Sequence, residues 1–208
     1  MKQAILLFTL VLTTFLCFGQ KQHLEPAKDF KIYQGELKEY YDNLFPLLYL
    51  GYSKAPIARY TSLPSFSSEY AFSVETIGGK NYVLSHSLSE NYWYAKNKKK
   101  VKLVSNKTEL TNELFLKIVE LFKVLDQQTK KSKHELLGND GVTYYFATTD
   151  NNGDIKIGKT WTPKESTLLG RLIKICDKIY LLGRGNNVSQ ADILNDIELI
   201  LKELKQMQ

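Results

Sequence analysis

Histidine, serine and carboxylate side chains occur in one short segment of this chain, where their types could support hydrolysis. His86 lies between Ser85 and Ser87. Neighbouring side chains in a strand point to opposite faces, so His86 cannot serve either serine directly as a base. A hydrolase in which His86 works with a nearby carboxylate, Glu75 or Glu90, stays open as the alternative function.

The other residues that could bind a metal or act as a nucleophile are scattered. The three histidines, at positions 23, 86 and 134, are not spaced as paired metal ligands. Cys176 falls on the apolar face of a predicted helix, where a buried and inert thiol is expected. The residues from Asp150 to Gly153 favour a hairpin turn over a calcium loop. The sequence therefore predicts no catalytic residue, no cofactor and no metal site.

Aromatic and lysine side chains gather in one segment and offer a binding surface instead. Tyrosine and tryptophan next to lysine suit a polar interface with aromatic anchors, or a stacking platform for a sugar or a peptide. Two other interpretations stay open. The aromatic side chains can belong to the hydrophobic core, as aromatics in strands usually do, and the lysines can be solvated turn residues without a partner. The candidate binding residues are Tyr92, Trp93, Tyr94, Lys98, Lys99, Lys100 and Trp161.

The charge of the chain argues against a nucleic-acid partner. The net charge is +6, and arginine occurs only at positions 59, 171 and 184. Nucleic-acid readers depend on arginine for bidentate contacts to bases and phosphates. A chain rich in lysine and asparagine more often reflects an AT-rich genome, and with the N-terminal segment described next it indicates a bacterial envelope protein.

Residues 1–19 are typical of a secretory signal peptide. Lys2 precedes an apolar run that is too short to span a bilayer comfortably. Cleavage after Gly19 would leave Gln20 as the N-terminus and no membrane span, although a retained anchor is the rival interpretation. The bulky Leu16 before Cys17 argues against a lipoprotein. We expect a periplasmic or secreted protein.

The mature chain is expected to form one domain without an internal disulfide. Residues 20–30 are polar and predict a flexible lead-in, and residues 31–208 are long enough for a single core. After cleavage Cys176 is the one cysteine left, and a single cysteine cannot make an intramolecular bridge.

Hydrophobic periodicity predicts four helices and at least five strands. The first helix begins at 36 and should end or kink near Leu44, because Pro46 follows. Residues 53–68 favour a surface loop, and Thr162 with Pro163 and Glu165 forms the best N-terminal helix signal in the chain. The other predicted helices cover 108–128, 163–182 and the segment after Ser189; the predicted strands lie at 70–74, from 82, at 91–95, 101–104, 142–148 and from 155.

These elements predict an α+β fold. We expect a single domain with an antiparallel sheet of five or six strands, built from hairpins and covered on one face by long helices. The hairpins at 70–84 and 142–157 look alike, and each precedes a tryptophan and a long helix. This suggests a weak ββα duplication, unless the likeness only reflects what aromatic hairpins share.

Together these features favour an exported, non-enzymatic binding protein. Its partner is expected to be a protein or a cell-envelope polymer, and an inhibitor or immunity-type role is one specific version. An envelope-acting hydrolase that uses His86 is the competing hypothesis. The sequence does not predict an oligomeric state.

Overall fold

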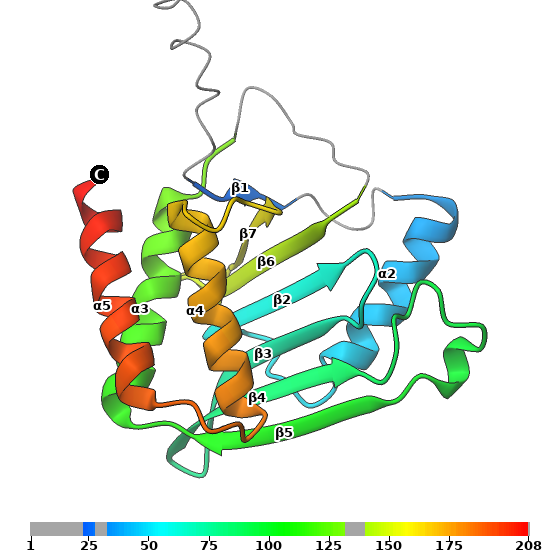
Figure 1. Ribbon diagram of the computed structural model, residues 1–208, viewed down its shortest axis with the longest axis horizontal. Coiled ribbons are helices and arrows are strands. Elements are labelled where there is room, and N and C mark those ends of the chain that lie inside the picture. The colour runs from blue at the N-terminus through cyan, green and yellow to red at the C-terminus, as the bar shows by residue number, and fades with distance from the viewer. Residues whose placement is uncertain (1–22, 28–32, 132–139, 208) are drawn as a thin grey trace, which may run out of the picture.

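The computed structural model describes residues 23–27, 33–131 and 140–207, which form one antiparallel sheet and four helices (Figure 1). The α+β class and the single antiparallel sheet predicted from the sequence are confirmed. The predicted signal peptide, residues 1–19, lies outside the described residues.

The sheet has seven strands, not five or six, and every neighbouring pair is antiparallel. Across the sheet the strands are β1 (Glu25–Pro26), β7 (Ile155–Trp161), β6 (Val142–Thr149), β2 (Ala58–Pro64), β3 (Tyr70–Ile77), β4 (Lys80–Leu88) and β5 (Leu103–Glu109).

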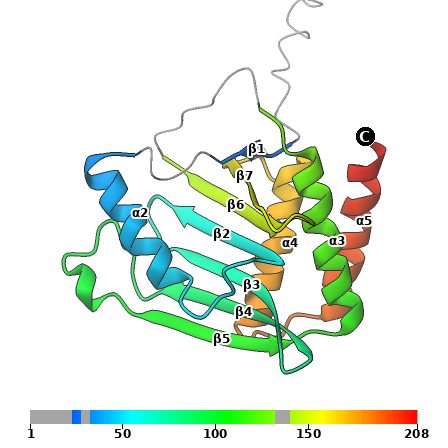
Figure 2. The same ribbon diagram turned by 180° about the vertical axis from the view of Figure 1, so that it is seen from behind.

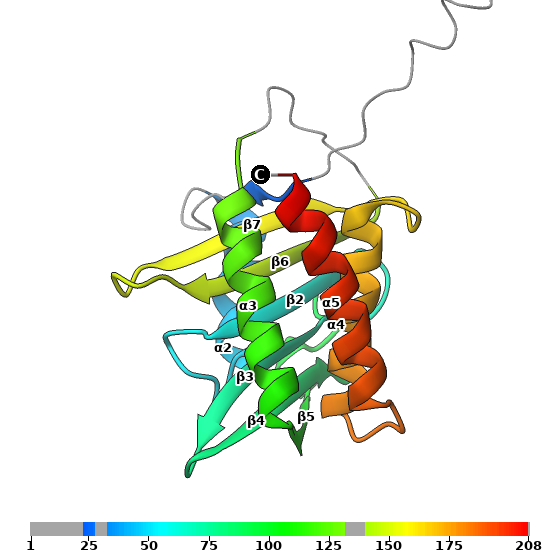
Figure 3. The ribbon, with the colours of Figure 1, turned by 90° about the vertical axis from the view of Figure 1, so that its left-hand side faces the viewer.

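Helices cover both faces of the sheet, which corrects the expectation of one covered face. Figure 3 looks onto the larger helical layer, in which α3 (Asn112–Gln128) and α4 (Leu168–Gly183) lie against the strands and α5 (Gln190–Gln206) packs over both of them. Figure 2 shows the opposite face, which α2 (Gly35–Leu48) crosses. Each face has its own hydrophobic cluster of buried side chains.

The three-helix layer packs on the sheet through the apolar stripes that the sequence predicts. Leu121 of α3 is fully buried, as are the facing side chains Tyr60 and Phe72. A polar contact joins α4 to the same strands, because the Asp177 carboxylate accepts hydrogen bonds from the hydroxyls of Tyr60 at 3.0 Å and Tyr70 at 2.8 Å. Burial raises the pKa of Asp177.

The helix α2 continues past Pro46, where an end or a kink was expected, and ends at Leu48. A proline in the last turn removes one backbone donor, and the next turn still closes through the hydrogen bond from Tyr49 N to Phe45 O, at 2.9 Å. Leu44 and Leu48 are both fully buried against the sheet, so packing maintains the helix across the proline.

Several predicted boundaries are wrong. The 53–68 segment holds β2, and the described part of the predicted lead-in, residues 23–27, pairs with β7 through β1. Residues 91–95 are a turn and not a strand, so β5 pairs with β4 instead. The predicted helix at 108–128 begins only at Asn112, since β5 extends to Glu109.

The predicted ββα duplication is imperfect. The β6–β7 hairpin leads directly to α4, whereas β5 separates the β3–β4 hairpin from α3, and β2 lies between the two hairpins in the sheet. The resemblance is therefore one of hairpins and not of complete halves.

The N-terminus of α4 lies five residues later than the sequence signal indicates. The Thr162 hydroxyl accepts a hydrogen bond from Val142 N at 2.7 Å and so extends the β6–β7 pairing, with Thr162 at a φ of 28°. Thr167 caps α4, and its hydroxyl accepts from Gly170 N at 3.1 Å. In the last helix the predicted cap is confirmed, because the Ser189 hydroxyl accepts from Asp192 N.

We predict that Thr167→Ala lowers the free energy of unfolding by about 1 kcal/mol, as the loss of an N-cap does. Chemical denaturation measures the loss, and hydrogen exchange at the Gly170 amide should accelerate. Thr162→Ala is the control and should leave the exchange of Gly170 unchanged. Acceleration in the Thr162 variant alone would place the cap at Thr162.

Candidate binding surface

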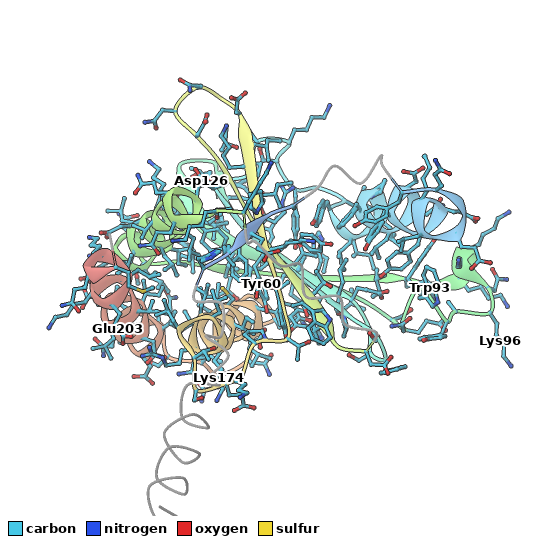
Figure 4. The ribbon with its side chains drawn as sticks, turned by 90° about the horizontal axis from the view of Figure 1, so that it is seen from above. Tyr60, Trp93, Lys96, Asp126, Lys174 and Glu203 are labelled. Carbon is cyan, nitrogen blue, oxygen red and sulfur yellow. The ribbon has the colours of Figure 1, made fainter. Side chains whose placement is uncertain are left out.

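The predicted binding residues of the 92–100 segment lie at one end of the sheet, in the connection between β4 and β5. At this end β2, β4 and β7 finish, and β3, β5 and β6 begin. In Figure 4, Trp93 and Lys96 lie beside α2, on the opposite side of the molecule from Glu203 of α5. The candidate surface is thus far from the three-helix layer.

A buried carboxylate fixes the start of this connection. Glu69, just before β3, is fully buried. Its Oε2 accepts from Tyr92 N at 2.9 Å, and its Oε1 accepts from the Tyr40 hydroxyl at 2.8 Å. Burial raises the pKa of Glu69, while these hydrogen bonds favour the ionised form. One side chain therefore ties the connection to both β3 and α2.

Asn91 joins the connection to the loop between β2 and β3. Its Nδ2 donates to Ser67 O at 2.7 Å, and its Oδ1 accepts from Tyr94 N at 3.1 Å. This brings the rings of Phe66 and Tyr94 together, with centroids 6.2 Å apart and planes at 11°. Phe66 is 70% exposed and Tyr94 is 60% exposed, so the stacked pair faces solvent.

The three consecutive aromatics of the segment have different environments. Tyr92 is buried and belongs to the core beneath α2, so its prediction as a binding residue is wrong. Trp93 is 38% exposed and meets the ring of Tyr40 edge-on at 5.2 Å. Tyr94 is the exposed member of the stack with Phe66. Because residues 91–95 form a turn, strand alternation does not apply to them.

The lysines follow in a short 3₁₀ turn, η2 (Lys98–Lys100). Lys98 is half-buried, with its ammonium 5.7 Å from the centre of the Tyr92 ring. The exposed lysines of the connection are Lys96, Lys99, Lys100 and Lys102. Within the described residues none of these five lysines forms an ion pair, whereas Lys80, Lys117, Lys156, Lys174, Lys178 and Lys205 all do. The connection therefore carries uncompensated positive charge.

Trp161 ends β7 at the same end of the sheet but is not part of this cluster. Its ring covers Gly141, where an added Cβ would meet the Trp161 ring at 2.7 Å. Gly141 O in turn accepts from Ser65 N at 2.8 Å, next to Phe66. No ring contact joins Trp161 to residues 92–94 among the described residues, so the predicted common platform is not formed.

We call Phe66, Trp93 and Tyr94 with Lys96, Lys99 and Lys100 the sheet-end surface. Sequence analysis missed Phe66 because it lies among serines in a segment taken for a loop. An isolated phenylalanine in such a polar stretch is expected to stay outside the hydrophobic core, and this was the signal for Phe66 that the sequence offered. Glu69 and Asn91 position the connection through contacts across the sheet. No spacing pattern in the sequence indicates such contacts, so these two roles could not be predicted.

His86 occupies a buried structural environment. It is 2% exposed, its Nδ1 lies 2.8 Å from Leu48 O, and its ring stacks on Tyr52 at 4.2 Å. Burial lowers its pKa. Ser85 and Ser87 point to the other face, where they contact Tyr180 O and the Arg184 guanidinium. The predicted opposition of His86 to its neighbouring serines is confirmed.

The carboxylates considered as partners of His86 lie in other surroundings. Glu75 Oε1 accepts from Ser53 N and from the Ser73 hydroxyl, while Glu90 is exposed. Cys176 is fully buried, as expected, and burial raises the pKa of its thiol. Among the described residues there is no group of three or more histidine, cysteine or acidic side chains that could hold a metal.

Searches against protein family models, curated proteins and solved structures gave no match. Within the described ranges, no helix has the length and apolar character needed to cross a membrane. Function must therefore be inferred from the geometry of the chain itself.

We predict that Glu69→Gln lowers the free energy of unfolding by about 1–3 kcal/mol, because the amide keeps one acceptor oxygen and places an NH2 group against either Tyr92 N or the Tyr40 hydroxyl. Urea denaturation measures the change. Glu90→Gln is the matched control, since Glu90 is exposed and its replacement should change stability by less than about 0.5 kcal/mol. Equal effects of the two variants would contradict the anchoring role of Glu69.

Proposed function

We propose that this protein is an exported, non-enzymatic binding protein that captures an acidic protein through the sheet-end surface. The observation that carries the proposal is the solvent-facing stack of Phe66 and Tyr94 beside lysines that have no carboxylate partner in the described structure. An inhibitor or immunity-type protein, which blocks another protein's active site, is one form of this function.

The exposed aromatic rings supply the binding energy in this proposal. Burying apolar surface is favourable by about 25 cal/mol per Å², and aromatic side chains are enriched among the residues that dominate interface energetics. Phe66 and Tyr94 are held by Asn91 in contact with each other and not with the core. A partner that covers them gains this burial without having to rearrange the fold.

The lysines supply charge complementarity. Exposed positive charges that are not neutralised within their own protein steer and orient a negatively charged partner. Lys96, Lys99 and Lys100 are exposed and follow Tyr94 in the same connection between β4 and β5, so the charges are close to the aromatic anchors in the chain. An anionic cell-envelope polymer is the second candidate partner, because it would meet the same charges and rings.

Export rests on the N-terminal sequence. We predict that mass spectrometry of the protein isolated from its native envelope fraction finds an N-terminus near Gln20 and no acyl group. An intact Met1 or a diacylated Cys17 would show that the segment is retained or lipidated. Either result would change the compartment and leave the sheet-end surface unaffected.

We predict that the double replacement Phe66→Ala/Tyr94→Ala abolishes capture of the partner from envelope extract and leaves the unfolding midpoint nearly unchanged. Both side chains are mostly exposed, so little core packing is lost. The control is Leu116→Ala/Leu199→Ala, which removes two side chains of similar exposure from α3 and α5.

The control should retain full capture. Equal loss in both variants would point to general stickiness, and full capture by the first variant would remove the sheet-end surface from the function. The hydrolase alternative would gain support if the purified protein cleaved an envelope substrate and His86→Ala removed that activity.

A further inference from the structure

The strand β5 leaves one edge of the sheet open. It is the last strand in the sheet, and no labelled helix or strand lies beyond it in Figures 1 and 2. Its pairing with β4 is continuous from Leu103 to Glu109, without a bulge, a proline or a glycine. The opposite edge ends in β1, which has two residues and includes Pro26. Short strands and prolines protect sheet edges from pairing, and β5 has neither feature.

Alternate residues of β5 turn their backbone groups toward this free edge. Ser89 N donates to Lys102 O at 2.9 Å, and Leu110 N donates to Asn81 O at 2.8 Å. Both bonds lie in the same register as the β4–β5 ladder, so the even-numbered residues of β5 are the ones that bond to β4. The N–H and C=O groups of the odd-numbered residues therefore point away from the sheet.

The outward groups belong to Leu103, Ser105 and Lys107. Among the described residues, no hydrogen bond reaches the backbone N–H or C=O of any of these three. The edge is closed only at its far end, where Gln190 Nε2 donates to Glu109 O at 3.0 Å. An extended chain has donors and acceptors with the same alternation, so it can satisfy the outward groups of this edge.

The free edge carries positive charge. Lys102 directly precedes β5 and Lys107 lies within it, and both are exposed. Neither lysine forms an ion pair in the described part of the chain, and Lys107 Nζ lies 5.0 Å from the centre of the Tyr82 ring. The acidic residue of the strand, Glu109, already pairs with Lys80 at 3.0 Å. The charge of the edge is therefore complementary to that of an acidic chain.

A second copy of this protein fits the edge poorly. Pairing of two β5 strands would bring the lysines of both copies to one seam, and like charges across neighbouring strands are destabilising. We propose that the free edge of β5 binds an extended, acidic segment of another protein as an eighth strand. Backbone hydrogen bonds to Leu103, Ser105 and Lys107 hold the segment. Its carboxylates lie against Lys102 and Lys107.

The proposal does not depend on the sheet-end surface. That surface lies in the connection before β5 and in the loop before β3, whereas strand addition uses the backbone of β5 itself. The double replacement Phe66→Ala/Tyr94→Ala should therefore leave binding at β5 unchanged. Capture at the sheet end and strand addition at β5 can fail separately.

The test titrates the purified protein with an acetylated and amidated peptide of the same length as β5 that alternates valine with glutamate. A peptide with lysine in place of glutamate is the control. NMR should show slower hydrogen exchange at the amides of Ser105 and Lys107 in the complex, and no change at Asn106, which already bonds to β4. The glutamate peptide should bind at least about tenfold more tightly than the lysine peptide at low ionic strength.

Two variants make the test specific. Ser105→Pro removes an outward donor and no bond to β4, so it should abolish binding, whereas Ser105→Ala keeps the donor and should bind normally. Lys102→Glu/Lys107→Glu should reverse the preference between the two peptides. Should Ser105→Pro fail to fold, the exchange pattern and the charge reversal still decide.

Four results would overturn the proposal. They are failure of the glutamate peptide to bind, equal affinities for the two peptides, and unchanged binding by folded Ser105→Pro. The fourth is exchange at Ser105 that slows with protein concentration alone, because this would show that β5 pairs with a second copy.

Discussion

The burial of both faces at the centre of the sheet is the constraint on which the rest of the structure depends. Six consecutive residues of β2, from Ala58 to Leu63, are buried. Ala58 and Tyr60 pack under the three-helix layer, while Arg59 and Thr61 face the α2 side. A strand in this position must present apolar side chains to the core on one face and side chains that suit a mixed polar environment on the other face.

This constraint explains which parts of the fold could be predicted from the sequence. The hairpins at β3–β4 and β6–β7 and the long amphipathic helices each carry their own periodic signal, so they were found. β2 was missed, because a strand buried on both faces need not alternate, and the prolines and serines of the 53–68 segment that contains it resemble a loop. The N-terminus of α4 was misplaced because Thr162 serves the pairing of β6 and β7 instead of the helix.

The candidate sites were predictable only in part. The tyrosines and lysines of the 92–100 segment stood out by composition, and Trp93, Tyr94 and the exposed lysines do lie on the surface. Tyr92 could not be separated from them, because its burial follows from the hydrogen bond between its backbone and Glu69, which lies 23 residues away in the chain.

The shared carboxylate of Glu69 has a further consequence for recognition. Tyr92 N and the Tyr40 hydroxyl both donate hydrogen bonds to this one side chain. The connection after β4 is therefore ordered before a partner binds. Binding would therefore lose little conformational entropy in this segment. The usual loss is about 0.5–1.5 kcal/mol for each mobile side chain that binding immobilises. Recognition at this end of the sheet would then resemble the docking of two rigid bodies, with affinity set by shape and charge and not by folding upon binding.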